Sequence, residues 1–241
     1  MILAHRSNRL GLSVANAPEV PIKLKIVTWN ILADRYFTKE RYTSADKILF
    51  DWTYRIQLVI SNILSFDADV ICLQEVELAT FKTDFLPLFD RYSYVQHTVC
   101  KKRSNPIGNV ILSKYSIRLL KETTHSIIAQ VEDIRIANTH LSVDSDDVTK
   151  LAQLSKLVTE FGKDLFLVGD FNSNFSDSFD LDGYGITRYR TCKTRFNWHE
   201  FDYIMIPSDY SVRYSLPIKD ANIPSSKNPS DHLPLIANIN D

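Results

Sequence analysis

Residues 69–76 read DVICLQEV, and this stretch decides the fold. The run from Val70 to Leu73 has the length and the aliphatic, β-branched composition of a buried strand. It ends in Gln74 and Glu75, two polar residues at the point where the chain leaves the predicted sheet. A buried strand that finishes in a carboxylate indicates a polar site at one rim of a β-scaffold.

Five further signatures repeat this pattern, each closing an apolar, β-like run and each bearing Asn, Asp or His. They are Thr28-Trp29-Asn30, Asn138-Thr139-His140, Gly169-Asp170-Phe171-Asn172, Phe201-Asp202-Tyr203 and Ser230-Asp231-His232. Six such strand ends in one chain are improbable by chance. We therefore expect their side chains to meet at a single rim and to hold a hard cation and a phosphate.

Each signature also has an ordinary structural explanation when it is taken alone. The alternatives are cap or turn roles for Asn30, Asp170, Asn172, Ser230 and Asp231, and an ion pair between Glu75 and Lys82. Isolated histidines are more often surface groups or satisfied core groups, which is the interpretation for His5, His97, His125 and His199. Only the ordered set of six favours a functional site.

The length and composition favour one large domain. A chain of 241 residues with 44% hydrophobic content can bury a full core. Apolar residues recur at helical spacing along 52–64 and 148–161, and Gly162 follows the second stretch in a C-cap position. A further core-facing helix is expected over 81–89, where Pro87 would shorten it.

Strand-like runs account for most of the remaining chain. They cover 23–32, 69–76, several antiparallel strands within 92–141, and then 165–170, 201–206, 210–216 and 232–239. Because strands outnumber helices and helices fall between blocks of strands, we expect an α/β (α+β) fold. The predicted form is a four-layer α/β/β/α sandwich of two mainly antiparallel sheets. It would be a single domain over residues 23–241, after a loosely docked leader at 1–22.

The overall charge decides little about partners. Lys and Arg number 28 and Asp and Glu number 29, which gives a formal net charge of −1 at pH 7. Nucleic-acid contact would therefore need a local basic patch. Two candidates are Lys101-Lys102-Arg103 and the group of Arg188, Arg190, Lys193 and Arg195. Such groups either track a phosphate backbone or form ordinary solvated loops.

The cysteines and the apolar runs bear on the compartment. Cys72, Cys100 and Cys192 are odd in number and far apart, which argues against a disulfide framework or a zinc site. No apolar stretch approaches the ~18 residues of a membrane helix, so no membrane contact is expected. We expect an intracellular, cytoplasmic protein. Arg6 and Arg9 in a segment without nearby acids leave organelle targeting as the alternative.

The residue types at the predicted rim indicate phosphoester chemistry. Asn30, Glu75, Asp170, Asn172 and Asp231 offer oxygen atoms, which suit Mg²⁺ or Mn²⁺ better than zinc. His140 and His232 could hold a phosphate oxygen as negative charge builds in the transition state, with Asp202 orienting His232. Asp170 and Asn172, two residues apart on an extended segment, would share a face and position an attacking water.

Three motifs resemble those of a known family. They are residues 28–36 (TWNILADRY), residues 66–77 (FDADVICLQEVE) followed by Phe85-Leu86-Pro87, and residues 230–235 (SDHLPL). Together they resemble the endonuclease/exonuclease/phosphatase superfamily of metal-dependent phosphoesterases, and within it the CCR4, nocturnin and Angel group. The resemblance runs from about Lys23 to the C-terminus, and its motifs are highly specific in combination.

The resemblance implies a role for each matching residue. Glu75 would be the principal metal ligand, with Asn30 and Asp231 completing the metal and water shell. Asp170 would polarise the attacking water, and Asn172 would contact the scissile phosphate. His140 and His232 would stabilise that phosphate, and Asp202 would orient His232. The residue types alone lead to the same assignment.

The substrate is less closely defined than the chemistry. CCR4-type deadenylases carry a proline after the histidine motif and an adenine-stacking phenylalanine, where this chain has Ser145 and Asn197, so the resemblance does not carry poly(A) preference. Phe196 or Trp198 could stack on a base instead, or Trp198 could simply pack. The residues expected to contact substrate are Asn109, Arg195 and Trp198.

The leading hypothesis is a Mg²⁺- or Mn²⁺-dependent, monomeric phosphodiesterase that hydrolyses single-stranded RNA. It would be a 3′-to-5′ exoribonuclease of the deadenylase-like type that uses a metal-activated water. The alternatives are a phosphatase or phosphodiesterase acting on a small nucleotide or a 2′,5′-oligonucleotide, a DNA endonuclease, and a non-catalytic RNA-binding adaptor. Retention of Glu75, Asp170 and His232 argues against the adaptor.

Overall fold

The computed structural model describes residues 23–98, 106–175, 181, 183–185, 187–195, 197–218 and 222–240. The predicted leader at 1–22, Cys100, the basic group at 101–103 and Phe196 lie outside these residues, so the expectations for them stay predictions.

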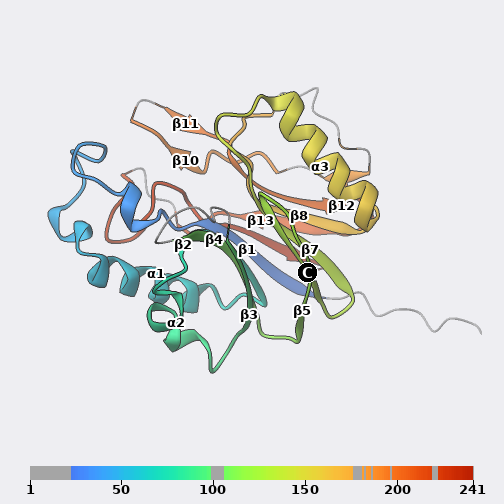
Figure 1. The fold of residues 1–241 in the computed structure, drawn as a ribbon, viewed down its shortest axis with the longest axis horizontal. Coiled ribbons are helices and arrows are strands. Elements are labelled where there is room, and N and C mark those ends of the chain that lie inside the picture. Colours follow the sequence, from blue (N-terminus) through green and yellow to red (C-terminus); the bar gives the residue numbers. More distant parts are fainter. Residues whose placement is uncertain are drawn as a thin grey trace, which may run out of the picture.

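Two six-stranded sheets form the centre of the fold (Figure 1). The first has the order β13-β14-β1-β2-β4-β3, with β13 (Val212–Ser215), β14 (Leu235–Ile239), β1 (Leu24–Asn30), β2 (Val70–Glu77), β4 (Ile107–Ser113) and β3 (Ser93–Thr98). The second has the order β5-β6-β7-β8-β12-β9, with β5 (Ile117–Glu122), β6 (Ser126–Val131), β7 (Ile134–His140), β8 (Leu165–Asp170), β12 (Asp202–Pro207) and β9 (Tyr184–Gly185). A separate hairpin pairs β10 (Cys192–Lys193) with β11 (Trp198–His199).

Alternation along the strands creates the four layers. In β1, Ile26 contributes to a core between the two sheets, whereas Val27 and Trp29 point to the opposite face. That outer face packs against α1 (Trp52–Phe66), and α3 (Asp147–Phe161) covers the outer face of the second sheet (Figure 1). The predicted four-layer α/β/β/α sandwich is confirmed. Both sheets are mixed, because each contains one parallel pair.

Capping residues mark the start of α1 and the end of α3. Asp51 accepts a hydrogen bond from Thr53 N at the start of α1, and Gly162 ends α3 with φ +92°. The helix expected over 81–89 is short, as the position of Pro87 predicted. It divides into α2 (Phe81–Asp84) and a 3₁₀ turn, Leu86–Leu88, since a proline has no N–H to continue an α-helix.

Short 3₁₀ turns at Asp34–Tyr36 and Lys47–Phe50 lie on the connection between β1 and α1. Among the helices that the structure describes, none combines the length and the apolar character that a membrane crossing requires.

The strand directions bring the signatures to one rim. β1 runs parallel to β2 and β7 runs parallel to β8, so the carboxyl ends of each pair lie at the same edge of their sheet. β12 is antiparallel to β8, and β14 is antiparallel to β1. The expectation that all six signatures close strands is therefore wrong for two of them. Asp202 is the first residue of β12, and Asp231 and His232 come before β14. Because β12 and β14 are antiparallel to their neighbours, the beginnings of these strands lie at the same rim as the carboxyl ends of the others.

Several signature residues join the two sheets and do not face the rim. Gln74 Nε2 donates to Thr28 Oγ1 at 3.1 Å and to Asn138 Oδ1 at 2.8 Å, and all three side chains are fully buried. Asn138 Nδ2 donates in turn to the carbonyls of Leu73 and Val110, each at 2.9 Å. Buried amides that satisfy one another fix the relative position of the sheets. The spacing of the side chains at the rim follows from this polar layer.

Arg55 in α1 binds backbone carbonyls of two segments that carry residues of the rim. Its guanidinium is completely buried and lies 4.9 Å from the Phe37 ring and 4.7 Å from the Trp52 ring. Nη1 donates to the Leu32 carbonyl at 2.7 Å, and more weakly to those of Ile31 at 3.3 Å and Pro229 at 3.4 Å. A single cation thus connects the segment after β1 with the segment before β14.

We expect Arg55→Met to destabilise the protein by about 2–4 kcal/mol, because the apolar stem remains but the buried carbonyls lose their donor. The midpoint of urea unfolding measures this change. Gln57→Met, on the exposed side of the same helix, is the matched control and should shift stability by no more than about 0.5 kcal/mol. Equal shifts in both variants would contradict the proposed bridging role.

Candidate active site

A cavity of about 420 Å³ opens at the rim where the signatures meet. Five of the predicted site residues line it: Glu75, His140, Asn172, Asp231 and His232. Asp170 and Asp202 lie directly behind this lining and are only 1% exposed. The structure therefore brings together residues from both sheets that are up to 157 positions apart in the sequence, from Glu75 to His232.

Glu75 reaches the cavity because β2 contains a bulge. Leu73 pairs with Val110 and Val76 pairs with Gly108, so two residues of β2 face a single residue of β4. Glu75 has φ +59°, a left-handed conformation that is uncommon outside glycine and that turns its side chain out of the strand alternation. Such strain is typical of functional positions.

The Glu75 carboxylate is held by neighbouring donors. Oε1 accepts from Asn30 Nδ2 and Oε2 accepts from Ala33 N, both at 3.0 Å. The donors come from the last residue of β1 and from the segment that follows it, and they orient the carboxylate at the cavity.

Asn30 connects two carboxylates. Its Oδ1 accepts from Leu32 N at 3.0 Å, which fixes the orientation of the amide and directs Nδ2 toward the acids. Nδ2 then donates to Glu75 Oε1 and to Asp170 Oδ2, each at 3.0 Å. Asn30 was expected to be a metal ligand, but in this arrangement it presents a donor, so we assign it to positioning Glu75 and Asp170.

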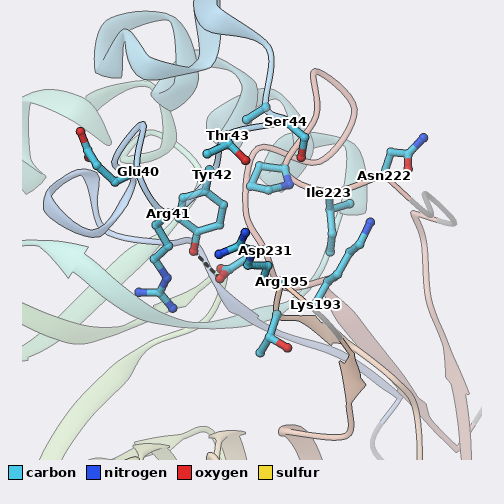
Figure 2. A pocket seen from close by; sticks show the side chains of 13 residues that line it. Glu40, Arg41, Tyr42, Thr43, Ser44, Lys193, Arg195, Asn222, Ile223 and Asp231 are labelled. Atoms are coloured by element: carbon cyan, nitrogen blue, oxygen red, sulfur yellow. Dashed lines mark hydrogen bonds between the residues drawn. The ribbon is translucent and has the colours of Figure 1, made fainter.

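Asp231 also lines the cavity and accepts a hydrogen bond from Tyr42 (Figure 2). The Tyr42 hydroxyl lies 2.6 Å from Asp231 Oδ2. Burial raises the pKa of Asp231, and the negative charge of Glu75 raises it further, against the opposing effects of His232 and the Tyr42 hydrogen bond. Burial also raises the pKa of Tyr42, so this hydroxyl stays protonated and continues to donate.

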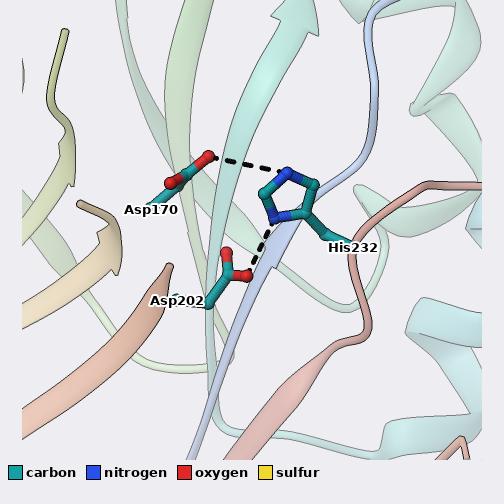
Figure 3. A group of neighbouring side chains, drawn as sticks. All are labelled: Asp170, Asp202 and His232. Atoms are coloured by element: carbon teal, nitrogen blue, oxygen red, sulfur yellow. Dashed lines mark hydrogen bonds and ion pairs between the residues drawn. The ribbon is translucent and has the colours of Figure 1, made fainter. Parts of the chain in front are cut away.

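Asp170, Asp202 and His232 form a buried triad at the cavity (Figure 3). His232 Nδ1 lies 2.8 Å from Asp202 Oδ2, and His232 Nε2 lies 3.7 Å from Asp170 Oδ2. Burial alone would lower the pKa of His232, but the charges of Asp202 and Asp170 outweigh it and raise that pKa well above 6.5. The geometry matches the expectation that Asp202 orients His232, and the imidazole is held in its charged form.

His140 approaches Asp170 from the other side. Its Nε2 lies 3.6 Å from Asp170 Oδ2, which is the same oxygen that faces His232. β7 and β8 produce this approach, because His140 and Asp170 are register partners at the ends of these parallel strands. One carboxylate oxygen therefore faces two imidazoles.

Asn172 departs from the extended geometry expected of it. Its φ is +51°, and Asp170 Oδ1 accepts from Asn172 N at 2.9 Å, so the two residues form an Asx turn. The Asn172 side chain still lines the cavity, and its Nδ2 donates to the Leu141 carbonyl at 2.9 Å. The two oxygens of Asp170 therefore have different roles. Oδ1 stabilises the turn at Asn172, and Oδ2 faces Asn30, His140 and His232 at the rim.

The donor set of the cavity fits a hard divalent cation. Glu75 and Asp231 are carboxylates that line the same cavity, and each adds unfavourable negative charge for the other. A cation would offset that repulsion, and oxygen-only donors favour Mg²⁺ or Mn²⁺. Ligand atoms of Asp170, Asp202 and His232 also lie within 4.8 Å of one another. That triad is already committed to internal hydrogen bonding, so the cavity carboxylates are the better candidates.

The three residues expected to contact substrate are not brought together. Asn109 is fully buried, and its Nδ2 donates to the carbonyls of His125 and Asn138, so it does not reach the cavity. Trp198 is half-buried on the β10–β11 hairpin, with Lys193 Nζ 5.7 Å from its ring. Arg195 is exposed and lines a neighbouring chamber. Asn109 thus packs between the sheets, and its expected contact with substrate stays a prediction.

Some residues at the site were not predicted from sequence. Arg41 and Tyr42 lie on the connection between β1 and α1, which has no periodic pattern to draw attention to them. His125 was interpreted as an ordinary histidine, yet it lines the cavity beside His140. Burial lowers the pKa of His125, which favours its neutral form. No spacing signal in the sequence distinguishes it from the other isolated histidines.

The sequence matches the model of the Endonuclease/Exonuclease/phosphatase family over residues 27–232. The CCR4-Not complex 3'-5'-exoribonuclease subunit Ccr4 of Saccharomyces cerevisiae is 36% identical over 69 residues, which are 29% of this chain and 8% of that protein. The curated relatives are much longer proteins. Across the first five matches, the aligned segment spans 8–14% of the relative's length.

Solved structures share the whole fold at low sequence identity. ANGEL2, described as a 2',3'-cyclic phosphatase and solved with adenosine-2',3'-vanadate, aligns with a TM-score of 0.70 and 20% identity. The alignment covers 91% of this chain and 96% of that one. The human Nocturnin catalytic domain with bound sulfate aligns with a TM-score of 0.63 and 21% identity, covering 91% and 93% of the two chains. The expected superfamily is confirmed by the family match, and the similar proteins include ones named Ccr4, Nocturnin and ANGEL2.

Proposed function

This chain belongs to the endonuclease/exonuclease/phosphatase family, and from that membership we propose that it is a Mg²⁺-dependent phosphodiesterase that shortens single-stranded RNA from its 3′ end. One observation carries the proposal. Two imidazoles converge on Asp170 at the wall of a cavity that Glu75 and Asp231 also line. Imidazole donors and hard-metal ligands at one cavity suit the attack of water on a phosphate. The exoribonuclease name of the yeast relative supports the choice of RNA and of polarity.

In the proposed reaction, a water molecule attacks the phosphorus of the last phosphodiester linkage. The new bond joins the water oxygen to phosphorus, and the bond from phosphorus to the 3′ oxygen of the preceding nucleotide breaks. Asp170 Oδ2 accepts the proton of the water, while the hydrogen bond from Asn30 Nδ2 holds this carboxylate in place. The products are a nucleoside 5′-monophosphate and an RNA with a free 3′-hydroxyl.

The two histidines and Asn172 bind the reacting phosphate in this proposal. His232 is held by Asp202 and carries a proton, so it can donate from Nε2 to a non-bridging phosphate oxygen. His140 does the same from the neighbouring strand. Asn172 uses one amide hydrogen for Leu141 and has the other available for the phosphate.

Glu75 and Asp231 are the proposed ligands of the cation, and Asn30 positions Glu75 among them. A divalent cation at these carboxylates supplies positive charge that offsets the negative charge developing on the phosphate oxygens.

A second candidate is a phosphoesterase that acts on a small nucleotide. The cavity of about 420 Å³ is in the size range of sites for single small ligands. ANGEL2, which shares the fold, is described as a 2',3'-cyclic phosphatase. This candidate predicts that a nucleoside 2′,3′-cyclic phosphate, or a short 2′,5′-linked oligonucleotide, is hydrolysed faster than a long RNA.

With Mg²⁺, we expect the purified protein to shorten a 5′-labelled mixed-sequence RNA stepwise and to release nucleoside 5′-monophosphates. Poly(A), single-stranded DNA, a 2′,5′-oligoadenylate and adenosine 2′,3′-cyclic phosphate complete the substrate panel. Glu75→Gln should abolish the ladder and weaken Mg²⁺ binding by at least about 10- to 100-fold, since even partners that only orient a metal ligand contribute that much. Titration calorimetry measures the Mg²⁺ affinity without any substrate.

Glu77→Gln is the matched control, because it makes the same change two residues further along β2. Glu77 pairs with Arg35 through bonds of 3.1 and 2.7 Å and does not line the cavity. We expect it to bind Mg²⁺ normally. Unchanged Mg²⁺ affinity in Glu75→Gln would contradict the metal assignment. Preferred hydrolysis of the cyclic phosphate would favour the second candidate, and internal cuts in DNA would favour an endonuclease. RNA binding without cleavage of any substrate would favour an adaptor.

A further inference from the structure

A second, larger chamber adjoins the proposed active site (Figure 2). Its volume is about 640 Å³, and it lies between the connection from β1 to α1, the β10–β11 hairpin and the segment around Ile223. The chamber shares Arg41, Thr194 and Asp231 with the cavity that holds the histidines. The two hollows therefore meet at Asp231. The reaction proposed above uses only the smaller one.

The charged residues in the described lining of this chamber are three cations and two acids. Arg41 comes from the connection after β1, and Lys193 and Arg195 come from the hairpin. Glu40 is the one other acidic residue among the described lining residues, apart from the buried Asp231. Arg41 and Lys193 lie on opposite sides of Asp231 (Figure 2). Cations on both sides of a polar hollow are suited to an anionic ligand that extends across it.

The walls of the chamber are fixed by interactions with other residues. Tyr42 donates to Asp231, so this hydroxyl forms part of the boundary between the two hollows. Lys193 Nζ lies 5.7 Å from the Trp198 ring, an arrangement that holds the lysine beside the hairpin. Lys193 N also donates to the Asp231 carbonyl at 2.8 Å. The hairpin is thereby attached to the segment that carries Asp231 and His232, and its cations have a defined position relative to the site.

Because successive phosphates of an RNA strand each carry one negative charge, a chain whose one phosphate reacts beside His232 must place a neighbouring phosphate nearby. We propose that the chamber of Arg41, Lys193 and Arg195 binds that neighbouring phosphate and its nucleotide. The enzyme then selects polynucleotides over nucleosides that carry a single phosphate. This inference rests on the proposed phosphodiesterase function and specifies its substrate class.

The test compares two substrates that differ in the number of phosphates. One is a labelled RNA decamer, and the other is thymidine 5′-(4-nitrophenyl phosphate), a diester with a single phosphate. The double variant Lys193→Gln/Arg195→Gln should lower the ratio of kcat/KM for the decamer to kcat/KM for the ester by about tenfold, through a higher KM for RNA. The control is Lys39→Gln/Arg190→Gln, which removes two exposed positive charges near the chamber that do not line it.

Binding gives a second measurement that does not depend on hydrolysis. With EDTA present, fluorescence anisotropy should show that the test variant binds the decamer about tenfold more weakly. The slope of log Kd against log salt should fall by about 0.7 for each phosphate that the variant no longer neutralises. The control variant should match the wild-type protein in affinity and in slope.

Unchanged RNA affinity and an unchanged kcat/KM ratio would overturn the inference. Equal losses on both substrates would also overturn it, since the cations would then serve the reacting phosphate. If no substrate is hydrolysed but the test variant alone loses RNA affinity and salt dependence, the chamber assignment stands and the proposed catalytic function fails.

Discussion

Replacement of Asp170 by asparagine is expected to lower kcat on RNA by about 10³-fold with little change in the fold. The two side chains have the same shape, but the amide cannot accept the proton of the attacking water, and general bases contribute typically about 10²- to 10⁴-fold to rate. The amide would also meet Asn30 Nδ2, which now donates to Asp170 Oδ2 at 3.0 Å. Single-turnover hydrolysis at saturating Mg²⁺ isolates the chemical step from product release.

Asp164→Asn is the matched control for this experiment. Asp164 immediately precedes β8, at the opposite end from Asp170, and forms an exposed ion pair with Arg135. It should retain the kcat of the wild-type enzyme. An Asp170→Asn enzyme that kept more than a tenth of the wild-type kcat would exclude Asp170 as the proton acceptor. The proposal would then need another base beside the cavity.

The second large effect is on folding. Gly169→Ala is expected to destabilise the protein by more than about 4 kcal/mol, which is exceptional for a single substitution. Gly169 has φ +140°, and a Cβ there would lie 1.9 Å from the Thr139 carbonyl oxygen in β7. Relief of this contact requires β7 and β8 to separate. These are the strands that place His140 and Asp170 side by side.

Urea unfolding and soluble yield measure the effect of Gly169→Ala. Gly185→Ala offers a comparison in the same sheet, because a Cβ at Gly185 would have its nearest neighbour, the Ile206 carbonyl oxygen, at an ordinary 3.7 Å. We expect this control to change stability by less than about 1 kcal/mol. Gly169→Ala with wild-type stability would mean that the strands can separate at no cost, contrary to their pairing in the structure.

The fold was predictable from sequence because its signals are local. The apolar period of α1, the buried run that became β2 and the glycine after α3 each specify an element within a few residues. The shortening of the helix over 81–89 was also predictable, because Pro87 has no N–H to continue the hydrogen-bond ladder. The short β10–β11 hairpin was not predicted, because two-residue strands carry no period.

The sequence indicated which residues come together at the site better than it indicated how their side chains are oriented. Asp170 and His232 meet at one rim, because polar residues at the ends of buried strands lie at the edge of the sheet. The donor role of Asn30 depends on the Leu32 N–H, and the burial of Asn109 depends on contacts across both sheets. The turn at Asn172 depends on a left-handed φ. Turn and cap roles for Asn172 and Asn30 were among the alternatives that the sequence offered, whereas the burial of Asn109 has no signature in the linear sequence.

The bond between Trp29 and His232 has a consequence for biosynthesis. Trp29 Nε1 donates to the His232 carbonyl at 2.9 Å across 203 positions of the chain, and β14 pairs with β1 directly after this contact. During synthesis β1 leaves the ribosome well before β14, and contacts of such sequence separation form late in folding. His232 is therefore among the last site residues to be placed. A chain in which Glu75, His140 and Asp170 are already placed therefore still lacks a complete rim until β14 has paired with β1.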